Sequence, residues 1–443
     1  MISLHGYVSG QVELGRPDSG GQIVYVLKLS ESLARLGYRV DIFTRRFEDQ
    51  PAIETVGERV RIVRIPCAGR QLIRKEWMCD VVPEWVTNAE AYIQRRGLTY
   101  AFMDSHYWDA GLAGDELASR LGIPHVHTPH SIGAWKRRNM EGDPAELDRQ
   151  YNFSRRIRDE RAIYDRADAL IATTPQQRDI LLGEYDVEPG KVAIVPPGYD
   201  DSRFFPVSAA TRQAIKRKIG VDGPLVLALG RIAANKGYDL LLQAMPTVIE
   251  RLPDTRLMLA IGSTIPTPGE ARQVEELRHL AAEYGIADQV LFHDYVPDEL
   301  LADTYRAADV FALSSRYEPF GMTAIEAMAC GTPAVITTQG GLWEMVAWGT
   351  EALYANPLDP PAFGHAIATI LQYPKIARQL ARFGSHRARA AFTWNGIAQE
   401  LINLLQDVGA SRRAGRSAGR SAVLADDLER METEPEWAPV GSS

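Results

Sequence analysis

The chain has 443 residues, enough for two or three domains with sizeable hydrophobic cores. Its formal net charge of −8 excludes a broad cationic field, so we expect neither a nucleic-acid partner nor a membrane-surface partner. Three cysteines (Cys67, Cys79 and Cys330) are too few for a disulfide framework, and no apolar run approaches the roughly 20 residues of a transmembrane helix. We therefore expect a cytoplasmic protein, whose oligomeric state these totals leave open.

Strand and helix patterns alternate through the first part of the chain. Residues 2–6 have the pattern of a short strand, residues 23–37 that of a helix, and residues 38–45 and 60–67 those of strands. Further strand patterns follow at 98–106, 123–131, 168–174 and 191–198. Apolar strands separated by helices predict a parallel sheet covered on both faces. The first strand is shorter than a central strand usually is, as in a chain that lacks its first residues.

A second series of strands and helices begins after a break near Phe205–Pro206. Strand patterns at 224–230, 255–262, 290–296, 310–315 and 332–338 alternate with helical ones. The sequence therefore predicts an α/β protein with two Rossmann-like, doubly wound halves, residues 1–205 and 206–385. Ligands of such sheets bind beyond the carboxyl ends of the strands. The pattern stops near Val408, and the small, charged residues of 409–443 predict a disordered tail.

In each half of the chain, a glycine-containing loop follows the first strand. DSGGQ (18–22) precedes the first helix, where its glycines would let backbone N–H groups approach an anion; a tight turn that requires glycine explains them equally well. No GxGxxG run follows a strand, which argues against a dehydrogenase. GRIAANKG (230–237) carries Arg231 and Lys236 at the carboxyl edge of the second sheet, where two cations suit a diphosphate. The alternative is solvated charge on a loop.

The stretch SRYEPFGMTAIEAMA (315–329) contains two glutamates in an apolar setting. A helix start near Gly321 would offer free N–H groups to a phosphate. Glu326 could accept hydrogen bonds from a ribose, and Glu318, in the loop, from a sugar. The alternative for Glu326 is a capping box with Thr323, since the pair has the S/T-x-x-E pattern.

HVHTPHS (125–131) contains three histidines, but a metal site needs converging ligands that this pattern does not supply. We expect a histidine that lines the cleft, and no bound metal. Cations cluster downstream, and most would be solvated, although a few could hold a phosphorylated acceptor; they are Lys136, Arg137, Arg138, Arg155, Arg156 and Arg158. Upstream, Lys75 is a further candidate.

Taken together, these motifs resemble those of the retaining glycosyltransferases of the GT-B fold, over residues 1–408. The resemblance rests on SGGQ, HTPHS, PPGYD, GRxxxxKG and a glutamate pair with seven residues between its members. It is strongest to the sucrose-phosphate synthase group. Within that group, TRRFEDQP, SHYWDAG, PPGYDDSRFFPVS and FTWNGIA are similar to the branch that makes mannosylfructose-phosphate.

The resemblance implies a role for individual residues around a nucleotide-sugar donor. Arg231 and Lys236 would neutralise the diphosphate, Glu318 would hold hydroxyls of the transferred sugar, and Glu326 would bind the ribose. His130 would lie beside the reacting carbon. The backbone of three residues would meet the distal phosphate, namely Gly321, Met322 and Thr323. Gly20, Gly21 and Gln22 would close over the donor phosphates and the acceptor.

For the acceptor, the resemblance implies fructose 6-phosphate in the first half. The positions that would hold it are Gln22, Lys75, Tyr107, Ser131, Lys136 and Arg156. A terminal helix, predicted over 386–408, would cross back onto the first domain. Transfer would occur on one face of the sugar, with the departing phosphate oxygen taking the acceptor's proton, so Glu318 need not be a nucleophile.

The donor is the least determined part of this prediction. GDP-mannose is favoured by the subfamily likeness, and UDP-glucose or ADP-glucose, as in a sucrose-phosphate synthase, is the alternative. A nucleotide-sugar epimerase or a non-catalytic sensor on the same fold also stays open. We expect no cofactor besides the nucleotide-sugar substrate.

Overall fold

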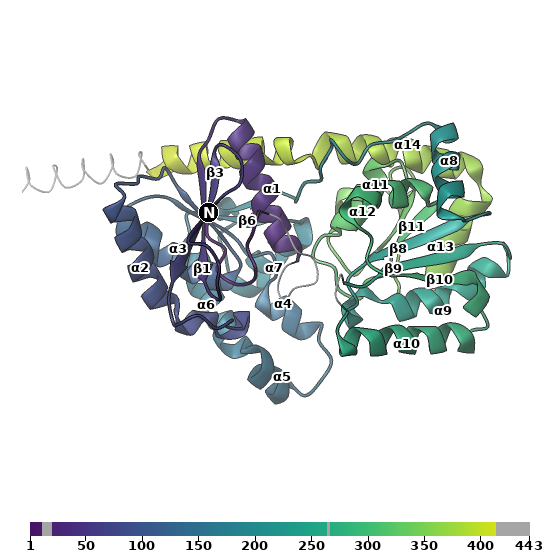
Figure 1. Cartoon of the computed structure of the whole chain (residues 1–443), viewed down its shortest axis with the longest axis horizontal. Helices are drawn as coiled ribbons and strands as arrows, with labels where there is room; N and C mark the ends of the chain where they lie inside the picture. The colour runs from purple at the N-terminus through teal and green to yellow at the C-terminus, as the bar shows by residue number, and fades with distance from the viewer. Residues whose placement is uncertain (11–19, 264–265, 413–443) are drawn as a thin grey trace, which may run out of the picture.

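The computed structural model describes residues 1–10, 20–263 and 266–412, which form two α/β domains side by side (Figure 1). Asp18 and Ser19 of the DSGGQ loop lie outside the described residues. The predicted disordered tail also lies outside them, apart from residues 409–412, which continue a helix.

In the first domain the strands lie in the order β2, β3, β1, β4, β5, β6, β7, with the segment at Ile2 between β1 and β4. All neighbours are parallel except the edge strand β2, which the sequence did not predict. The strands are β1 (Val40–Arg46), β2 (Ile53–Thr55), β3 (Val60–Pro66), β4 (Met103–His106), β5 (His125–Thr128), β6 (Ala169–Ala172) and β7 (Val192–Ile194). The helices are α1 (Gly21–Arg35), α2 (Val82–Arg95), α3 (Trp108–Leu121), α4 (Gly133–Arg138), α5 (Pro144–Tyr151), α6 (Phe153–Arg166) and α7 (Pro175–Tyr185), with 3₁₀ turns η1 (Lys75–Asp80) and η2 (Pro189–Lys191).

The strand predicted at residues 2–6 is only a bridge in the centre of this sheet. Ile2 pairs with Phe43 on one side and Ser105 on the other. The chain bends away at His5, whose imidazole Nδ1 lies 2.9 Å from a carboxylate oxygen of buried Asp109. The sheet is thus completed by a very short segment, and the chain turns early toward the carboxyl edge.

The second domain contains six parallel strands in the order β10, β9, β8, β11, β12, β13. They are β8 (Leu225–Gly230), β9 (Arg256–Ile261), β10 (Val290–His293), β11 (Val310–Leu313), β12 (Ala334–Thr337) and β13 (Leu353–Ala355). The helices are α8 (Ala209–Ile219), α9 (Tyr238–Ile249), α10 (Pro268–Glu283), α11 (Asp298–Ala307), α12 (Met322–Ala329), α13 (Pro360–Gln372) and α14 (Pro374–Ala391), with 3₁₀ turns η3 (Ala234–Lys236), η4 (Ala287–Gln289) and η5 (Leu342–Met345). Because the chain leaves β8 to one side and returns as β11 on the other, the loops after β8 and β11 flank the topological switch point.

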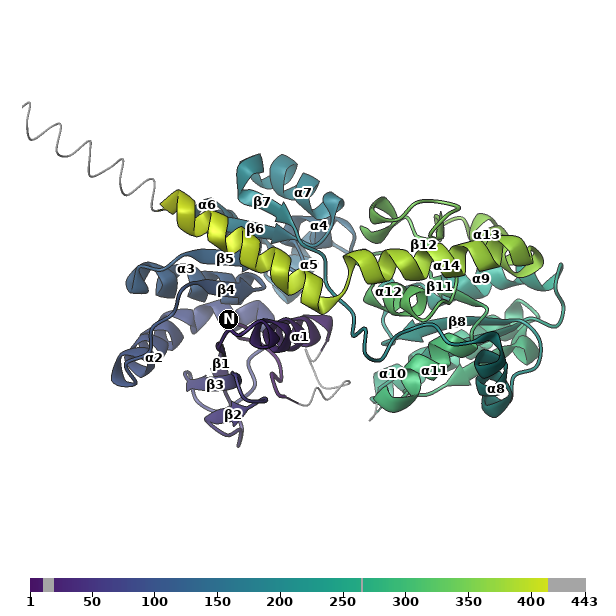
Figure 2. The same cartoon turned by 90° about the horizontal axis from the view of Figure 1, so that it is seen from above.

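Two segments connect the domains and run beside each other. The first passes through Tyr199, whose N–H donates to the carbonyl of Phe392 in the second, at 2.8 Å. The helix of residues 394–412 then lies along the first domain, where Trp394 and Leu401 enter the core that α1 covers (Figure 2). A side chain at Gly198 would overlap Trp394, with a Cβ only 2.6 Å from its indole. The crossing onto the first domain therefore occurs at residues 392–393, between α14 and this last helix.

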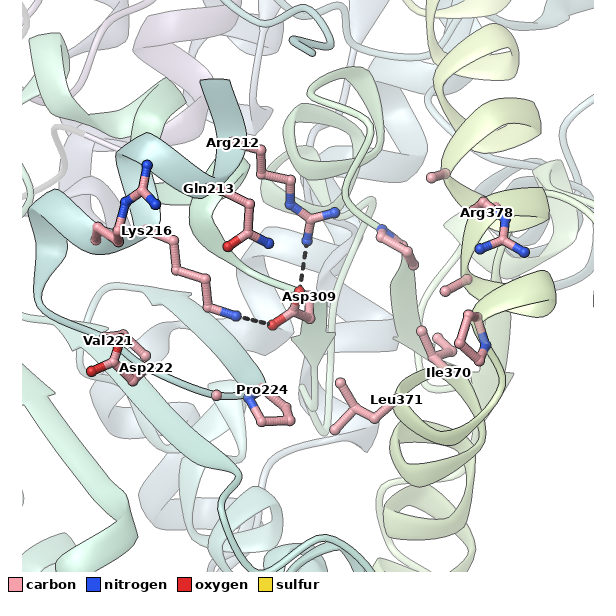
Figure 3. Close-up of a pocket in the computed structure, with 16 residues that line it drawn as sticks. Arg212, Gln213, Lys216, Val221, Asp222, Pro224, Asp309, Ile370, Leu371 and Arg378 are labelled. Atoms are coloured by element: carbon pink, nitrogen blue, oxygen red, sulfur yellow. Dashed lines mark hydrogen bonds and ion pairs between the residues drawn. The ribbon is translucent and has the colours of Figure 1, made fainter. Parts of the chain in front are cut away.

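A cavity of about 520 Å³ opens at the amino ends of β8, β11 and β12, opposite the switch-point loops. At its base, Asp309 accepts hydrogen bonds from Lys216 and from Arg212 (Figure 3). It also accepts one from the N–H of Leu225. The two cations thus share one carboxylate, which ties α8 to the sheet. This cavity serves to anchor α8 rather than to assemble the predicted donor residues.

Candidate active site

The two loops at the second domain's switch point are bound to each other. Lys236 Nζ donates to Glu318 Oε2 at 2.6 Å, and the N–H of Arg316 donates to the carbonyl of Asn235 at 2.8 Å. The guanidinium of Arg316 also makes two 2.6 Å bonds to Asp239. The structure therefore brings Lys236 and Glu318 together from positions 82 residues apart.

The backbone around Glu318 fixes its carboxylate. The N–H of Glu318 donates to the carbonyl of Gln339 at 3.1 Å. A Cβ at Gly340 would lie 2.4 Å from the carbonyl oxygen of Glu318, so only glycine fits at position 340. Ser315 Oγ donates to Glu318 Oε2 at 3.1 Å. Both hydrogen bonds to the carboxylate found among the described residues thus go to Oε2, which leaves Oε1 available to another donor.

Two helix N-termini face each other across the domain boundary. A Cβ at Gly21, which begins α1, would lie 3.7 Å from Met322 Sδ, which begins α12. Gly20 and Gly321 precede these helices, and neither helix has a side-chain cap or an acidic residue in its first turn. By contrast, α5, α7, α8, α10 and α13 begin with capping side chains. Uncapped N–H groups of both helices therefore lie near the domain boundary, and groups of this kind suit an anion.

Arg231 approaches the same position from the second domain. Its guanidinium carbon would lie 4.0 Å from a Cβ at Gly20, and the side chain is exposed. Within the part of the chain that the structure describes, we find no hydrogen bond or ion pair for this guanidinium. The two predicted cations thus differ in their contacts among the described residues. Lys236 forms an ion pair with Glu318, whereas the guanidinium of Arg231 has no such partner.

Glu326 lies on α12 with its carboxylate turned toward α11. Tyr305 Oη donates to Glu326 Oε2 at 2.8 Å. Burial raises the pKa of this carboxyl to about 7, although the hydrogen bond from Tyr305 opposes the shift. The capping-box alternative is wrong, because Gly321 occupies the N-cap with φ +112° and Thr323 is already inside the helix. Tyr305 was missed by the sequence analysis, because nothing in a helical pattern marks which tyrosine faces α12.

On the first domain, two non-glycine residues with left-handed backbone lie at the carboxyl edge of the sheet. Tyr107 follows β4 with φ +78°, and His130 follows β5 with φ +57°. Such backbone is costly and clusters at functional sites. His130 Nε2 lies 3.0 Å from His106 Nδ1. The rings of Tyr25 and His130 pack in a T-shaped arrangement with their centres 4.8 Å apart. Burial holds the pKa of His130 well below its ordinary value, so the imidazole is neutral at pH 7.

The predicted acceptor residues fall into two sets. Gln22 is the second residue of α1, and its side-chain amide donates to Ser3 Oγ and to the carbonyl of His106, both at 3.2 Å. Lys75 begins η1 and Lys136 lies on α4, with its ammonium 5.1 Å from the ring centre of Tyr151. These side chains are partly exposed, whereas Tyr107 and Arg156 are buried.

Arg156 is 2% exposed and holds its neighbours in place. Its Nε donates to Glu160 at 2.7 Å, one Nη donates to the hydroxyl of Tyr107 at 2.9 Å, and the other donates to the carbonyl of Ser131. Glu160 accepts further bonds from the N–H of Gly133 and the hydroxyl of Tyr185. Arg156 thus supports two predicted acceptor residues, and its own contact with an acceptor stays a prediction.

The three histidines of HVHTPHS do not converge as metal ligands. Ser105 Oγ lies 2.7 Å from His125 Nε2 and 2.8 Å from His127 Nδ1, so both bind a hydroxyl. Over residues 1–10, 20–263 and 266–412 no group of three histidine, cysteine or acidic side chains is arranged to hold a metal ion. The same residues include no helix long and apolar enough to cross a membrane.

Two α/β domains lie side by side, with the loops after β8 and β11 of the second domain at their boundary. This is the architecture of a glycosyltransferase of the GT-B fold, which confirms the predicted fold. Residues 20–198 match the model of the "Glycosyl transferase 4-like domain", and residues 211–387 match that of "Glycosyl transferases group 1". The chain belongs to the group 1 glycosyltransferases.

Two curated relatives and one solved structure extend this assignment. The chain is 50% identical over 410 residues to a mannosylfructose-phosphate synthase of Agrobacterium fabrum, covering 92% of this chain and 90% of that protein. It is 34% identical to a D-inositol 3-phosphate glycosyltransferase of Corynebacterium urealyticum, covering 92% and 95%. A sucrose-phosphate synthase from Thermosynechococcus elongatus superposes with a TM-score of 0.79 at 32% identity, covering 93% and 99% of the two chains. The predicted resemblance to this group is confirmed.

Proposed function

We propose that the chain transfers a mannosyl group from GDP-mannose to fructose 6-phosphate with retention of configuration, giving mannosylfructose-phosphate. The observation that carries the proposal is that Arg231 lies near Gly20, at the uncapped start of α1, and that the uncapped start of α12 lies beside it. This arrangement suits the diphosphate of a nucleotide sugar. The 50% identity to the mannosylfructose-phosphate synthase supports the choice of mannose and of the acceptor.

In the proposed reaction, the bond from the sugar's C1 to the diphosphate oxygen breaks, and a bond to the acceptor oxygen forms on the same face. The departing phosphate oxygen takes the acceptor's proton, so no enzymic base is required. Arg231 and Lys236 stabilise the charge that develops on the diphosphate. Glu318 then holds sugar hydroxyls through Oε1, and Glu326 accepts from the ribose.

A second candidate uses UDP-glucose or ADP-glucose with fructose 6-phosphate. The sucrose-phosphate synthase of the same architecture, at 32% identity, favours it. The two candidates share the diphosphate site and differ in the base and in one hydroxyl of the sugar, which Oε1 of Glu318 could read.

A matrix of donors and acceptors tests the proposal. GDP-mannose, UDP-glucose and ADP-glucose are each incubated with fructose 6-phosphate, with inositol 3-phosphate and with no acceptor, and released nucleoside diphosphate and product are measured. Formation of mannosylfructose-phosphate at the highest kcat/KM supports the proposal, and preference for UDP-glucose or ADP-glucose supports the second candidate. Donor conversion without acceptor would identify an epimerase, and no product at all would fit a sensor. A parallel series with EDTA determines whether transfer depends on a divalent metal, which the sequence leaves open.

A further inference from the structure

One aromatic side chain of the second domain packs against the first domain. Tyr317 precedes Glu318 in the loop after β11, yet its ring packs against Trp135 of α4 in a T-shaped arrangement, with the ring centres 4.7 Å apart. It also packs against the buried first-domain cluster that includes Trp108. The side chains of two consecutive residues thus turn toward opposite domains, since Glu318 forms its ion pair with Lys236.

The backbone of Tyr317 is fixed to the second domain. The side-chain amide of Asn235, in the loop after β8, donates to the carbonyl of Tyr317 at 3.1 Å. The carbonyl of Asn235 in turn accepts the N–H of Arg316 at 2.8 Å. Because these bonds lie within the second domain, the contact between Tyr317 and Trp135 exists only while the two domains are together.

The hydroxyl of Tyr317 is buried, and it has no hydrogen-bond partner among the described residues. Burial raises the pKa of Tyr317 to about 12, while the side chain of Ser131 and the charge of Arg156 oppose this shift. The groups around the hydroxyl thus include two predicted acceptor residues of the first domain. A buried phenol usually finds a partner, so this one suits a ligand that enters beside Ser131 and Arg156.

We propose that Tyr317 is a substrate-binding residue of the acceptor site, whose hydroxyl donates a hydrogen bond to an oxygen of the phosphosugar held by the first domain. This inference rests on the proposed function and deepens it. The hydroxyl lies beside Ser131 and Arg156, and the ring contacts Trp135, which precedes Lys136. Three of the predicted acceptor residues are therefore neighbours of Tyr317 in space or of its partner in the chain.

An acceptor that is held from both sides couples its binding to closure of the cleft. In the proposed function Glu318 holds the donor sugar, and Tyr317 is its neighbour in the same loop. Binding of the phosphosugar to Tyr317 stabilises the arrangement in which the domains are together, which brings the acceptor to the donor and excludes water. The second domain thus contributes to the recognition of both substrates.

Tyr317→Phe tests this role, because it removes the hydroxyl and keeps the ring that packs against Trp135. Steady-state kinetics with GDP-mannose and fructose 6-phosphate varied in turn give both KM values, and release of GDP without acceptor gives the rate of donor hydrolysis. We expect the KM for fructose 6-phosphate to rise about 3- to 30-fold, as for the loss of one hydrogen bond. The KM for the donor and the rate of donor hydrolysis should stay within about twofold.

Two outcomes of the kinetics overturn the inference. One is an unchanged KM for fructose 6-phosphate, and the other is an equal rise of both KM values, since weaker packing between the domains acts on both substrates. Thermal unfolding without substrate is the second measurement. The midpoint of Tyr317→Phe should equal or exceed that of the unmodified protein, because the hydroxyl has no partner to lose. A lower midpoint would show a protein partner for the hydroxyl and would also overturn the inference.

Tyr199→Phe is the matched control. The hydroxyl of Tyr199 is also buried without a partner among the described residues, and its ring packs in a core cluster of the second domain rather than against Trp135. Both KM values should stay within about twofold, and a raised KM for fructose 6-phosphate in this variant counts against the inference. If the unmodified protein prefers another donor or phosphorylated acceptor, the proposed function fails in that choice, and the same comparison with the preferred substrates still tests Tyr317. If it transfers sugar to no acceptor, both proposals fail.

Discussion

The two walls of the cleft carry polar groups of different kinds. On the second domain, Lys236 and Glu318 form an ion pair at 2.6 Å, and Arg231 is exposed. On the first domain, His106 Nδ1 lies 3.0 Å from His130 Nε2, and burial keeps the pKa of His130 well below its ordinary value. A charged wall suits a ligand that brings a diphosphate, whereas a neutral wall suits hydroxyl groups and excludes water when the domains close.

Arg156 is a buried charge on the first domain, where the partly exposed Lys75 and Lys136 are charged as well, and its environment explains how it differs from Lys236. Its charge is compensated by Glu160 beneath the surface, so it contributes structure and little field. Lys236 is also paired, but its partner stands at the switch point, where an incoming diphosphate could compete for the ammonium. The contrast between an ion pair that is permanent and one that can be exchanged generates the predictions below.

The largest effect is expected for Arg156→Ala. Removing the guanidinium leaves Glu160 as a buried carboxylate without its cation, which costs about 3–5 kcal/mol of unfolding free energy. Denaturant unfolding measures this loss. Arg158→Ala is the control, because Arg158 is exposed on the same helix and should change stability by less than about 0.5 kcal/mol. Intact stability together with a raised KM for fructose 6-phosphate would instead make Arg156 a direct acceptor contact.

Lys236→Ala should act mainly on turnover. The ammonium stabilises charge on the departing diphosphate, and removal of one such donor costs roughly 10²–10³ in kcat. Glu318 is 8% exposed and loses its cation in this variant, so the thermal midpoint should also fall, and turnover is compared well below that midpoint. Arg217→Ala, an exposed cation of the cavity at the opposite sheet edge, is the matched control. Unchanged turnover in Lys236→Ala would remove this lysine from the site.

Lys136→Ala tests the predicted acceptor site of the first domain. Hydrogen bonds to charged groups contribute about 1.5–3 kcal/mol, so the KM for fructose 6-phosphate should rise roughly 10- to 100-fold while that for the donor changes far less. Steady-state kinetics with each substrate varied in turn measure both constants. Arg137→Ala, the exposed neighbour, should leave both unchanged. Equal increases of the two constants would contradict a phosphate contact for Lys136.

The charged wall was largely predictable from the sequence, and the neutral wall was not. Lys236 and Glu318 each follow a strand of the second half, so the rule that carboxyl ends of parallel strands meet at one edge brings them together. The same rule gave His130 its place on the first domain. The likeness to a known family supplied the roles, which neither periodicity nor spacing determines.

What could not be predicted depends on side-chain direction within buried elements. Whether Glu326 is bound by Thr323 or by Tyr305 depends on where α12 begins, and the left-handed Gly321 moved that start by two residues relative to the capping-box pattern. The contact between His106 and His130 requires the register between β4 and β5, which a single sequence does not specify. Both misses concern partners of predicted residues rather than the residues themselves.

The effect expected for Glu326→Gln depends on pH. The pKa of Glu326 is raised from 4.5 to about 7 by burial, so the folded protein keeps a proton that the unfolded chain releases above pH 4.5. The carboxyl therefore contributes stability below pH 4.5, and this contribution is lost as the pH rises through 7. The amide has no such loss. Glu326→Gln should be within about 1 kcal/mol of the unmodified protein at pH 5 and more stable by about 3 kcal/mol at pH 8.

Thermal unfolding of both proteins at pH 5 and pH 8 measures this difference, with the exposed Glu283→Gln as a control that should show no dependence on pH. The same ionisation should govern the donor, because a carboxylate accepts from both hydroxyls of a ribose whereas an amide offers one acceptor oxygen. Nucleoside diphosphate should therefore bind Glu326→Gln more weakly at pH 8, where the variant is the more stable protein. If Glu326→Gln neither gains stability nor loses affinity at pH 8, then Tyr305, rather than the ribose, determines the state of this carboxyl.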